Sequence, residues 1–216
     1  MISLSIYCST QTMSVALYKG QILLEILKKK ISKNKIDSLP LIVEKVLISN
    51  NVNCIDRILF CRGPGSYTAN RSVKALAQGL SLARNSKLVT LDNFEVYLGN
   101  LGSLKNKHDG IIVFFQDFND KFFIKFFYKK KDKYFDYEEK FYHVDGTNLK
   151  KTILEKLYEK PNTLIISDHK VYLNKFNKTG INIKYSLPNA ADLANSFFKG
   201  YGVDNLEIIY HHTYYK

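Results

Sequence analysis

Long apolar runs are missing from this sequence of 216 residues, and none reaches the length of about 18 residues that a membrane-spanning helix requires. Residues 1–6 lack a basic leader and begin with a strand-like pattern, which predicts no signal peptide. Cysteine is also scarce: Cys8, Cys54 and Cys61 have neither metal-site nor redox spacing. We therefore expect a globular protein, without a membrane segment, whose thiols are free and mostly buried in a reducing cytoplasm.

Residue patterns typical of hydrolases are missing as well. None of the five histidines forms the helical H-x-x-x-H pair of a metal site, and the adjacent His211 and His212 would point to different faces of one element. Ser66 has no histidine close in sequence that could serve as its base, which leaves only a distant histidine for that role. We predict no catalytic residue and no metal ligand in this chain.

Arginine contributes little to the basic composition. The formal net charge is +12, from 32 Lys and Arg residues against 20 Asp and Glu, but only four residues are arginines. Lysine, Asn, Ile, Tyr and Phe share A/T-rich codons, so a biased genome would produce this composition whatever the protein does. We interpret the lysine runs at residues 28–30 and 129–131 as solvated hairpin ends. Nucleic-acid binding through a lysine surface stays open as an alternative.

The most informative stretch is a glycine-rich loop between a predicted strand at residues 57–61 and a predicted helix at residues 70–83. It consists of Gly63, Pro64, Gly65, Ser66, Tyr67 and Thr68. Two glycines allow unusual backbone angles, and either Ser66 or Thr68 can cap the helix. The spacing fits neither a Walker A loop nor a dinucleotide fingerprint. The loop is either a contact for a phosphate or a partner, or simply a tight, capped turn.

The order of predicted elements is that of an actin-like (ribonuclease H-like) α/β lobe. Three strands at residues 2–8, 13–17 and 21–27 form a meander, and a helix at residues 36–49 follows them. The strand and helix around the loop come next, and a strand at residues 87–91 ends this pattern. A helix at residues 92–101, capped by Asp92, precedes a polar boundary. We predict two lobes, residues 1–104 and a smaller or degenerate lobe at residues 105–216.

The predicted second lobe contains fewer distinctive patterns. We expect a hairpin of residues 111–115 and 122–128, a third strand at residues 134–144 and a helix at residues 148–158. A buried strand at residues 163–167 and a late helix that begins near Pro188 complete it.

The loop followed by Arg71 resembles the signature of the TsaB family, the non-catalytic partner in bacterial threonylcarbamoyladenosine synthesis on tRNA. The centre of the signature is intact, but positions at its edges differ from the family pattern: Cys61, Ala69, Asn70 and Val73. The hairpin predicted at residues 111–128 resembles a second family segment, D-A-R-x-x-E-V-Y. Its aspartate is retained as Asp117, whereas Asn119 stands in place of its arginine.

The resemblance also suggests what this chain lacks. Active actin-like ATPases carry an aspartate at the end of the first strand, where this sequence has Tyr7. A phenol with a pKa of about 10 is a poor magnesium ligand. We therefore expect that the chain does not hydrolyse ATP and binds no cofactor.

Membership in this family would imply a heterodimer with TsaD, which carries the ATP and the metal, and with TsaE in a larger complex. The contact would be a bundle of the helices at residues 36–49 and 70–83, through which a homodimer could also form. The candidate interface residues are Arg71, Ala75, Leu76, Gly79 and Leu82. tRNA would be met only through the complex. The family is grouped with glycoproteases, and the alternatives are an independent actin-like phosphotransferase or a direct tRNA-binding protein.

Overall fold

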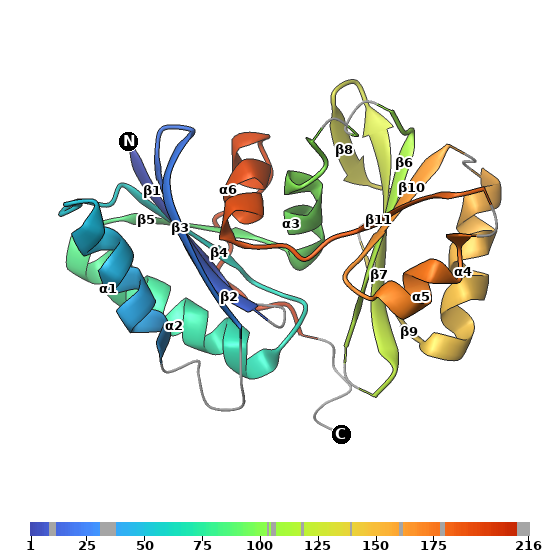
Figure 1. Ribbon diagram of the computed structural model, residues 1–216, viewed down its shortest axis with the longest axis horizontal. Coiled ribbons are helices and arrows are strands. Elements are labelled where there is room, and N and C mark those ends of the chain that lie inside the picture. Colours follow the sequence, from blue (N-terminus) through green and yellow to red (C-terminus); the bar gives the residue numbers. More distant parts are fainter. Residues whose placement is uncertain are drawn as a thin grey trace. The chain divides into compact units, whose positions relative to one another are not determined.

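The computed structural model describes residues 1–8, 12–30, 38–102, 104, 107–117, 119–138, 140–159, 162–177 and 180–210. The chain forms two compact units, each with its own sheet (Figure 1). Unit 1 comprises Met1–Asn100 and Pro188–Lys216, and unit 2 comprises Leu101–Leu187. The predicted lobe of residues 105–216 therefore needs correction, because its last part packs in unit 1. No helix in the described part of the chain is long and apolar enough to cross a membrane.

Unit 1 is built on a sheet with the strand order β3-β2-β1-β4-β5. Its strands are β1 (Ile2–Tyr7), β2 (Thr12–Lys19), β3 (Ile22–Lys30), β4 (Arg57–Cys61) and β5 (Lys87–Leu91). The first three are antiparallel, whereas β4 runs parallel to β1 and β5 parallel to β4. This arrangement is the predicted meander followed by two crossover strands.

Helices cover both faces of this sheet. They are α1 (Leu39–Ser49), α2 (Tyr67–Arg84), α3 (Asn93–Gly99) and α6 (Ala190–Phe198). Figure 1 shows α1 and α2 on one face and α3 and α6 on the other. Alternation along β1 explains the difference, because Leu4 and Ile6 join the apolar core beneath α1 and α2. Ser5 points the other way, and its hydroxyl donates to the carbonyl of Ala190 at the start of α6.

Unit 2 repeats the same strand order, as β8-β7-β6-β10-β11. Its elements are β6 (Gly110–Gln116), β7 (Lys121–Lys130), β8 (Lys133–Asp136), β9 (Tyr142–Asp145), α4 (Gly146–Glu159), β10 (Thr163–Ser167), α5 (Lys170–Asn174) and β11 (Asn182–Tyr185). Strands β6, β10 and β11 are parallel, and β7 is antiparallel to β6. The helices α4 and α5 pack over one face, where rings such as Phe114 and Phe176 form the core.

Several predicted boundaries differ from the structure. The strand expected at residues 134–144 is two strands, β8 and β9, which pair with opposite ends of β7. The helix expected from residue 36 is described from Leu39, and residues 31–37 lie outside the described part. The turn at residues 9–11 and the pair His211 and His212 also lie outside it. Two short elements, α5 and β11, were not predicted.

Candidate functional site

The glycine-rich loop connects the end of β4 to the start of α2, as its sequence predicts. Ser66 is the N-cap, and its hydroxyl accepts a hydrogen bond from the amide of Ala69 at 3.4 Å. Thr68 lies inside the first turn, so of the two candidate caps the structure uses Ser66. The Gly63–Pro64 peptide bond is cis.

Gly63 cannot be replaced without strain. Its φ is +98°, in the region that favours glycine. A Cβ at this position would lie 2.8 Å from the carbonyl oxygen of Ile209 and 3.0 Å from the side-chain nitrogen of Asn70. The loop is therefore packed against backbone on one side and the buried Asn70 on the other, which is a structural reason for a glycine here.

Asn93, the first residue of α3, forms hydrogen bonds to the glycine-rich loop. Its amide donates to the carbonyl of Gly63 at 2.7 Å, and its side-chain nitrogen donates to the carbonyl of Pro64 at 3.1 Å. Its side-chain oxygen accepts a hydrogen bond from the hydroxyl of Tyr7 at 2.6 Å. Tyr7 is fully buried. Tyr7, at the position where active actin-like ATPases carry an aspartate, thus supports the glycine-rich loop through Asn93.

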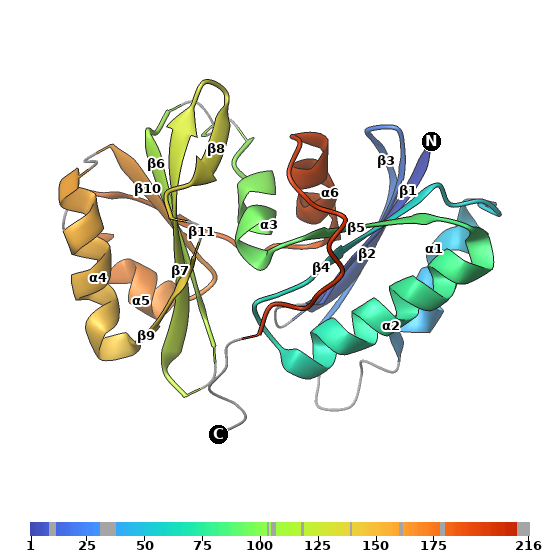
Figure 2. The same cartoon turned by 180° about the vertical axis from the view of Figure 1, so that it is seen from behind.

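A second support comes from the C-terminal segment of unit 1, residues 201–210, which Figure 2 shows crossing β5 toward the start of α2. Val203 and Thr90 exchange backbone hydrogen bonds of 2.9 Å in both directions. The amide of Ile209 donates to the carbonyl of Arg62 at 2.8 Å, and the ring of Tyr210 lies 5.0 Å from the ring of Tyr67. These contacts span more than 100 residues, and the sequence pattern alone does not predict them.

The five candidate interface residues divide into two groups. Arg71, Ala75, Gly79 and Leu82 are exposed on α2 at helical spacing, with Leu82 87% exposed. Leu76 is only partly buried and packs against the core of unit 1, so it belongs mainly to the other face. Open space surrounds Gly79, where an added Cβ would meet no atom within 4 Å.

Arg71 contacts the loop directly. Its guanidinium donates to the hydroxyl of Tyr67 at 2.7 Å and lies 5.0 Å from the centre of that ring. Together with the contact between Tyr67 and Tyr210, this aligns an exposed cation with two rings at the start of α2. Helix α1, which lies on the same face of the sheet as α2, carries two exposed apolar side chains, Leu41 and Ile48.

Unit 2 contains a buried contact between a histidine and a carboxylate that the sequence pattern does not indicate. The imidazole Nε2 of His143 lies 2.8 Å from a carboxylate oxygen of Asp117, and both side chains are largely buried. Asn119, in place of the family's arginine, occupies the turn after β6 with a φ of +53°. Within the described ranges, no three His, Cys, Asp or Glu side chains gather as they would around a metal ion.

Comparisons with known proteins agree with this architecture. Residues 23–109 match the model of a family described as "TsaD: tRNA N6-adenosine threonylcarbamoyltransferase". YeaZ from Pseudomonas aeruginosa is 18% identical, with a TM-score of 0.72 over 97% of this chain and 99% of that one. An uncharacterised protein with similarity to peptidase YeaZ, from the same organism, is 17% identical with a TM-score of 0.73 over 97% and 98%.

A more distant structure is the ethanolamine utilisation protein EutJ from Carboxydothermus hydrogenoformans, with 11% identity and a TM-score of 0.51 over 92% of this chain and 90% of that one. No curated protein matches the chain. The chain therefore has the fold of YeaZ, a protein of the TsaB family, over nearly its whole length and matches a TsaD-type domain in residues 23–109. These matches confirm both the resemblance to the TsaB family and the actin-like fold class.

Proposed function

We propose that this chain is a non-catalytic scaffold subunit that binds TsaD and enables threonylcarbamoyladenosine formation on tRNA. In this proposal ATP and metal belong to TsaD, TsaE joins the larger complex, and the complex as a whole acts on tRNA. The protein would act in the cytoplasm, where free thiols such as those of Cys8, Cys54 and Cys61 stay reduced.

The observation that carries the proposal is the exposed face of α2. Small residues at Ala75 and Gly79 let another helix approach closely, and the exposed Leu82 adds apolar area next to them. Burying a leucine of this exposure contributes about 1.5–3 kcal/mol. A partner helix packed along this face would bury it, and Leu41 and Ile48 of α1 extend the same apolar character.

Tyr7 supports a scaffold role over catalysis. A fully buried phenol that donates to Asn93 holds the loop in one conformation and offers no carboxylate to a nucleotide-bound metal. Two further features, the C-terminal segment and the Ser66 cap, fix the start of α2. A rigid helix start is what a docking surface needs, because binding then costs little conformational entropy.

The test is to mix this chain with TsaD from the same organism and measure the mass of the complex by size-exclusion chromatography with light scattering. Leu82→Glu places a charge on the proposed interface, and the exposure of Leu82 predicts a folded variant. We expect a one-to-one complex for the wild type and its loss for Leu82→Glu. Val171→Glu is the matched control, since Val171 is an exposed aliphatic residue of α5 in unit 2 and should leave the complex intact.

Separate species for the wild-type mixture, with and without nucleotide and TsaE, would contradict the proposal. A complex that survives Leu82→Glu would reject the α2 face as its site. Running each protein alone shows whether the same face supports a homodimer, which Leu82→Glu would then dissociate. The competing enzyme, a small actin-like phosphotransferase, predicts heat from binding of Mg-ATP to the isolated chain in calorimetry.

A further inference from the structure

The hairpin of β7 and β8 in unit 2 carries a row of rings on one of its faces. Tyr128 pairs directly with Phe135 in the antiparallel register, which places both side chains on the same face. Their ring centres are 6.1 Å apart, and the ring of Tyr137 lies 6.3 Å from that of Tyr128. Phe135 is 40% and Tyr137 43% exposed. We name Tyr128, Phe135 and Tyr137 the aromatic row.

Lysines surround the aromatic row. The ammonium of Lys133 lies 5.7 Å from the ring centre of Phe135, and that of Lys156 on α4 lies 5.1 Å from the ring centre of Tyr137. Residues 129–133 hold four lysines and one aspartate. Glu138, which lies 3.3 Å from the Lys156 ammonium and 3.7 Å from that of Lys140, offsets part of this charge at one end. Asp136, between Phe135 and Tyr137 in the sequence, pairs with the ammonium of Lys125 at 2.7 Å, so the lysines of residues 129–133 leave an excess of positive charge on this hairpin.

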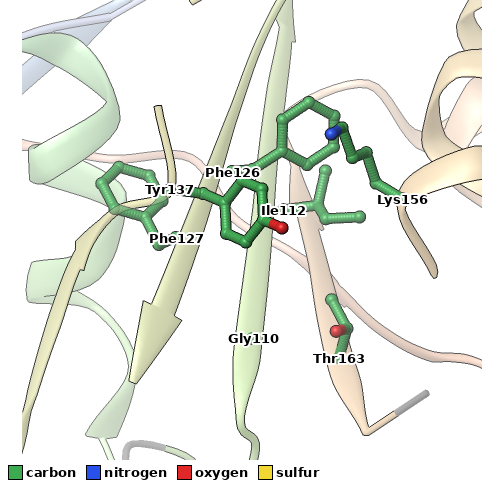
Figure 3. A pocket seen from close by; sticks show the side chains of 7 residues that line it. All are labelled: Gly110, Ile112, Phe126, Phe127, Tyr137, Lys156 and Thr163. Carbon is green, nitrogen blue, oxygen red and sulfur yellow. The ribbon is translucent and has the colours of Figure 1, made fainter. Parts of the chain in front are cut away.

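A cavity adjoins Tyr137 (Figure 3). Its lining combines the rings of Phe126, Phe127 and Tyr137 with Lys156 and Thr163. Its volume of about 30 Å³ suits one or two water molecules, since a water needs about 10–15 Å³ by this measure. A ring-shaped ligand would therefore stack on the exposed faces of the aromatic row and would not enter the cavity.

We propose that the aromatic row and its lysines bind unpaired nucleotides of an RNA strand. Exposed rings offer stacking surfaces for bases, and lysines spaced along the same hairpin offer partners for phosphates, which is the combination that single-stranded RNA requires. An acidic peptide would use the lysines but leave the rings without flat partners. The choice of RNA rests on the proposed function, in which the complex acts on tRNA.

As a run of charge, residues 129–131 indicate no more than a solvated hairpin end. The pairing of β7 with β8 adds what the lysine run does not show, namely that Tyr128 and Phe135 meet on one face next to Lys133. This surface lies in unit 2, whereas the proposed TsaD contact lies on α2 in unit 1. The two proposals therefore concern different surfaces, and the variants that test one surface leave the other unchanged.

The experiment uses the full chain alone, without TsaD, and a short fluorescein-labelled single-stranded RNA in a fluorescence anisotropy titration at fixed salt. Phe135→Ala and Tyr137→Ala each remove one exposed ring, and we expect each to raise Kd about tenfold, within the range for loss of one base-stacking contact. Tyr185→Ala is the matched control, because Tyr185 is 40% exposed in the same unit and has the ammonium of Lys170 4.7 Å from its ring centre.

Circular dichroism and thermal melting verify that each variant is folded. The proposal predicts an unchanged Kd for Tyr185→Ala and binding at least about tenfold weaker for duplex RNA of the same length, whose bases are already stacked. It is overturned if the wild type does not bind, if Tyr185→Ala weakens binding as much as Phe135→Ala, or if duplex binds as tightly as single strand.

A salt titration tests the lysines separately. Each phosphate neutralised on a single strand contributes about −0.7 to the slope of log K against log salt concentration. Lys133→Ala should reduce the magnitude of the slope by about that amount. Lys170→Ala, which removes an exposed lysine beside Tyr185, should leave the slope unchanged. Equal slopes for all three proteins would reject Lys133 as a phosphate contact and with it the proposed site.

Discussion

Unit 1 and unit 2 share a strand order but differ in one connection. It follows the strand that pairs in parallel with the first strand of each unit, which is β4 in unit 1 and β10 in unit 2. In unit 1, β4 leads through the glycine-rich loop into α2, a helix of 18 residues. In unit 2, β10 leads through Asp168 and His169 into α5, a helix of 5 residues. The sheets provide equivalent scaffolds, and the connections decide which unit presents a long helical face.

The two connections are also stabilised differently. The unit 1 loop depends on contacts from distant parts of the chain, through Asn93 and Ile209. In the unit 2 connection the cap is local, because the imidazole Nδ1 of His169 accepts a hydrogen bond from the amide of Tyr172 at 3.3 Å, and the distant contact of His169 is with the ring of Phe122, whose centre lies 5.5 Å away. We therefore expect perturbations of the unit 1 loop to cost much more than perturbations of its counterpart.

The largest expected effect is in thiol reactivity, which reports on unit 1 alone, because all three cysteines lie there. Cys54 is exposed and should react at once with a thiol reagent, whereas the buried Cys8 and Cys61 should react slower by a factor on the order of 10³ or more, since their reaction requires opening of the unit. Cys54→Ser should abolish the fast phase. Two fast thiols in the native protein would mean that unit 1 opens readily.

One of these thiols, that of Cys8, makes the free energy of unfolding depend on pH. Burial raises the pKa of the Cys8 thiol to about 11 from its ordinary value of 9.0, so the folded state keeps its proton where the unfolded state has lost it. This contribution to stability is complete below the unfolded pKa and disappears as the pH rises through about 11. Cys8→Ala should flatten the alkaline decline in the free energy of unfolding measured by urea titration, and an unchanged decline would assign it to other groups.

Gly63→Ala should be the most costly single substitution in the comparison of the two connections. A φ of +98° strains an alanine, and its Cβ would contact the carbonyl oxygen of Ile209 at 2.8 Å. We expect a loss of about 2–4 kcal/mol in the free energy of unfolding. Gly79→Ala is the matched control, since Gly79 is helical with open space around it and should gain up to about 1 kcal/mol. Equal stabilities for the two variants would contradict the packing of this loop.

Which of these features the sequence predicts depends on the distance between the contacting residues. The strands at residues 57–61, 87–91 and 163–167 were predicted to the residue, because each is a short apolar run with clear ends. Asp92 is the predicted cap of α3, and Ser66 is one of the two candidates that the sequence offers for the cap of α2, whereas the capping box that Asp92 forms with Glu95 was not predicted. Such features depend on neighbours within a few positions.

Long-range contacts could not be predicted in the same way. The hydrogen bond from Tyr7 to Asn93 spans 86 residues, and that from Ile209 to Arg62 joins the C-terminal segment to the loop. The split of residues 134–144 into β8 and β9 depends on where each pairs with β7. The residue pattern carries no information on these pairings, so the supports of the candidate site became visible only in the structure.

Tyr7→Phe should have an intermediate effect. The substitution keeps the ring but removes the donor to Asn93, leaving a buried amide oxygen without this partner. We expect a loss of about 1–3 kcal/mol in urea unfolding followed by circular dichroism. Because Asn93 also bonds to Gly63 and Pro64, the variant should bind TsaD more weakly as well. Unchanged stability would show that the hydrogen bond has no net value and that the loop is held by other contacts.

His169→Ala in unit 2 should have the smallest effect. It removes the N-cap acceptor of a five-residue helix, which is worth about 0.5–1 kcal/mol. His169→Asn restores a side chain that can accept the amide hydrogen bond of Tyr172, so its unfolding midpoint in urea should return toward that of the wild type. A loss for His169→Ala as large as for Gly63→Ala would mean that both connections are equally critical. The longer helix α2, and not the way its loop is held, would then be what distinguishes unit 1 from unit 2.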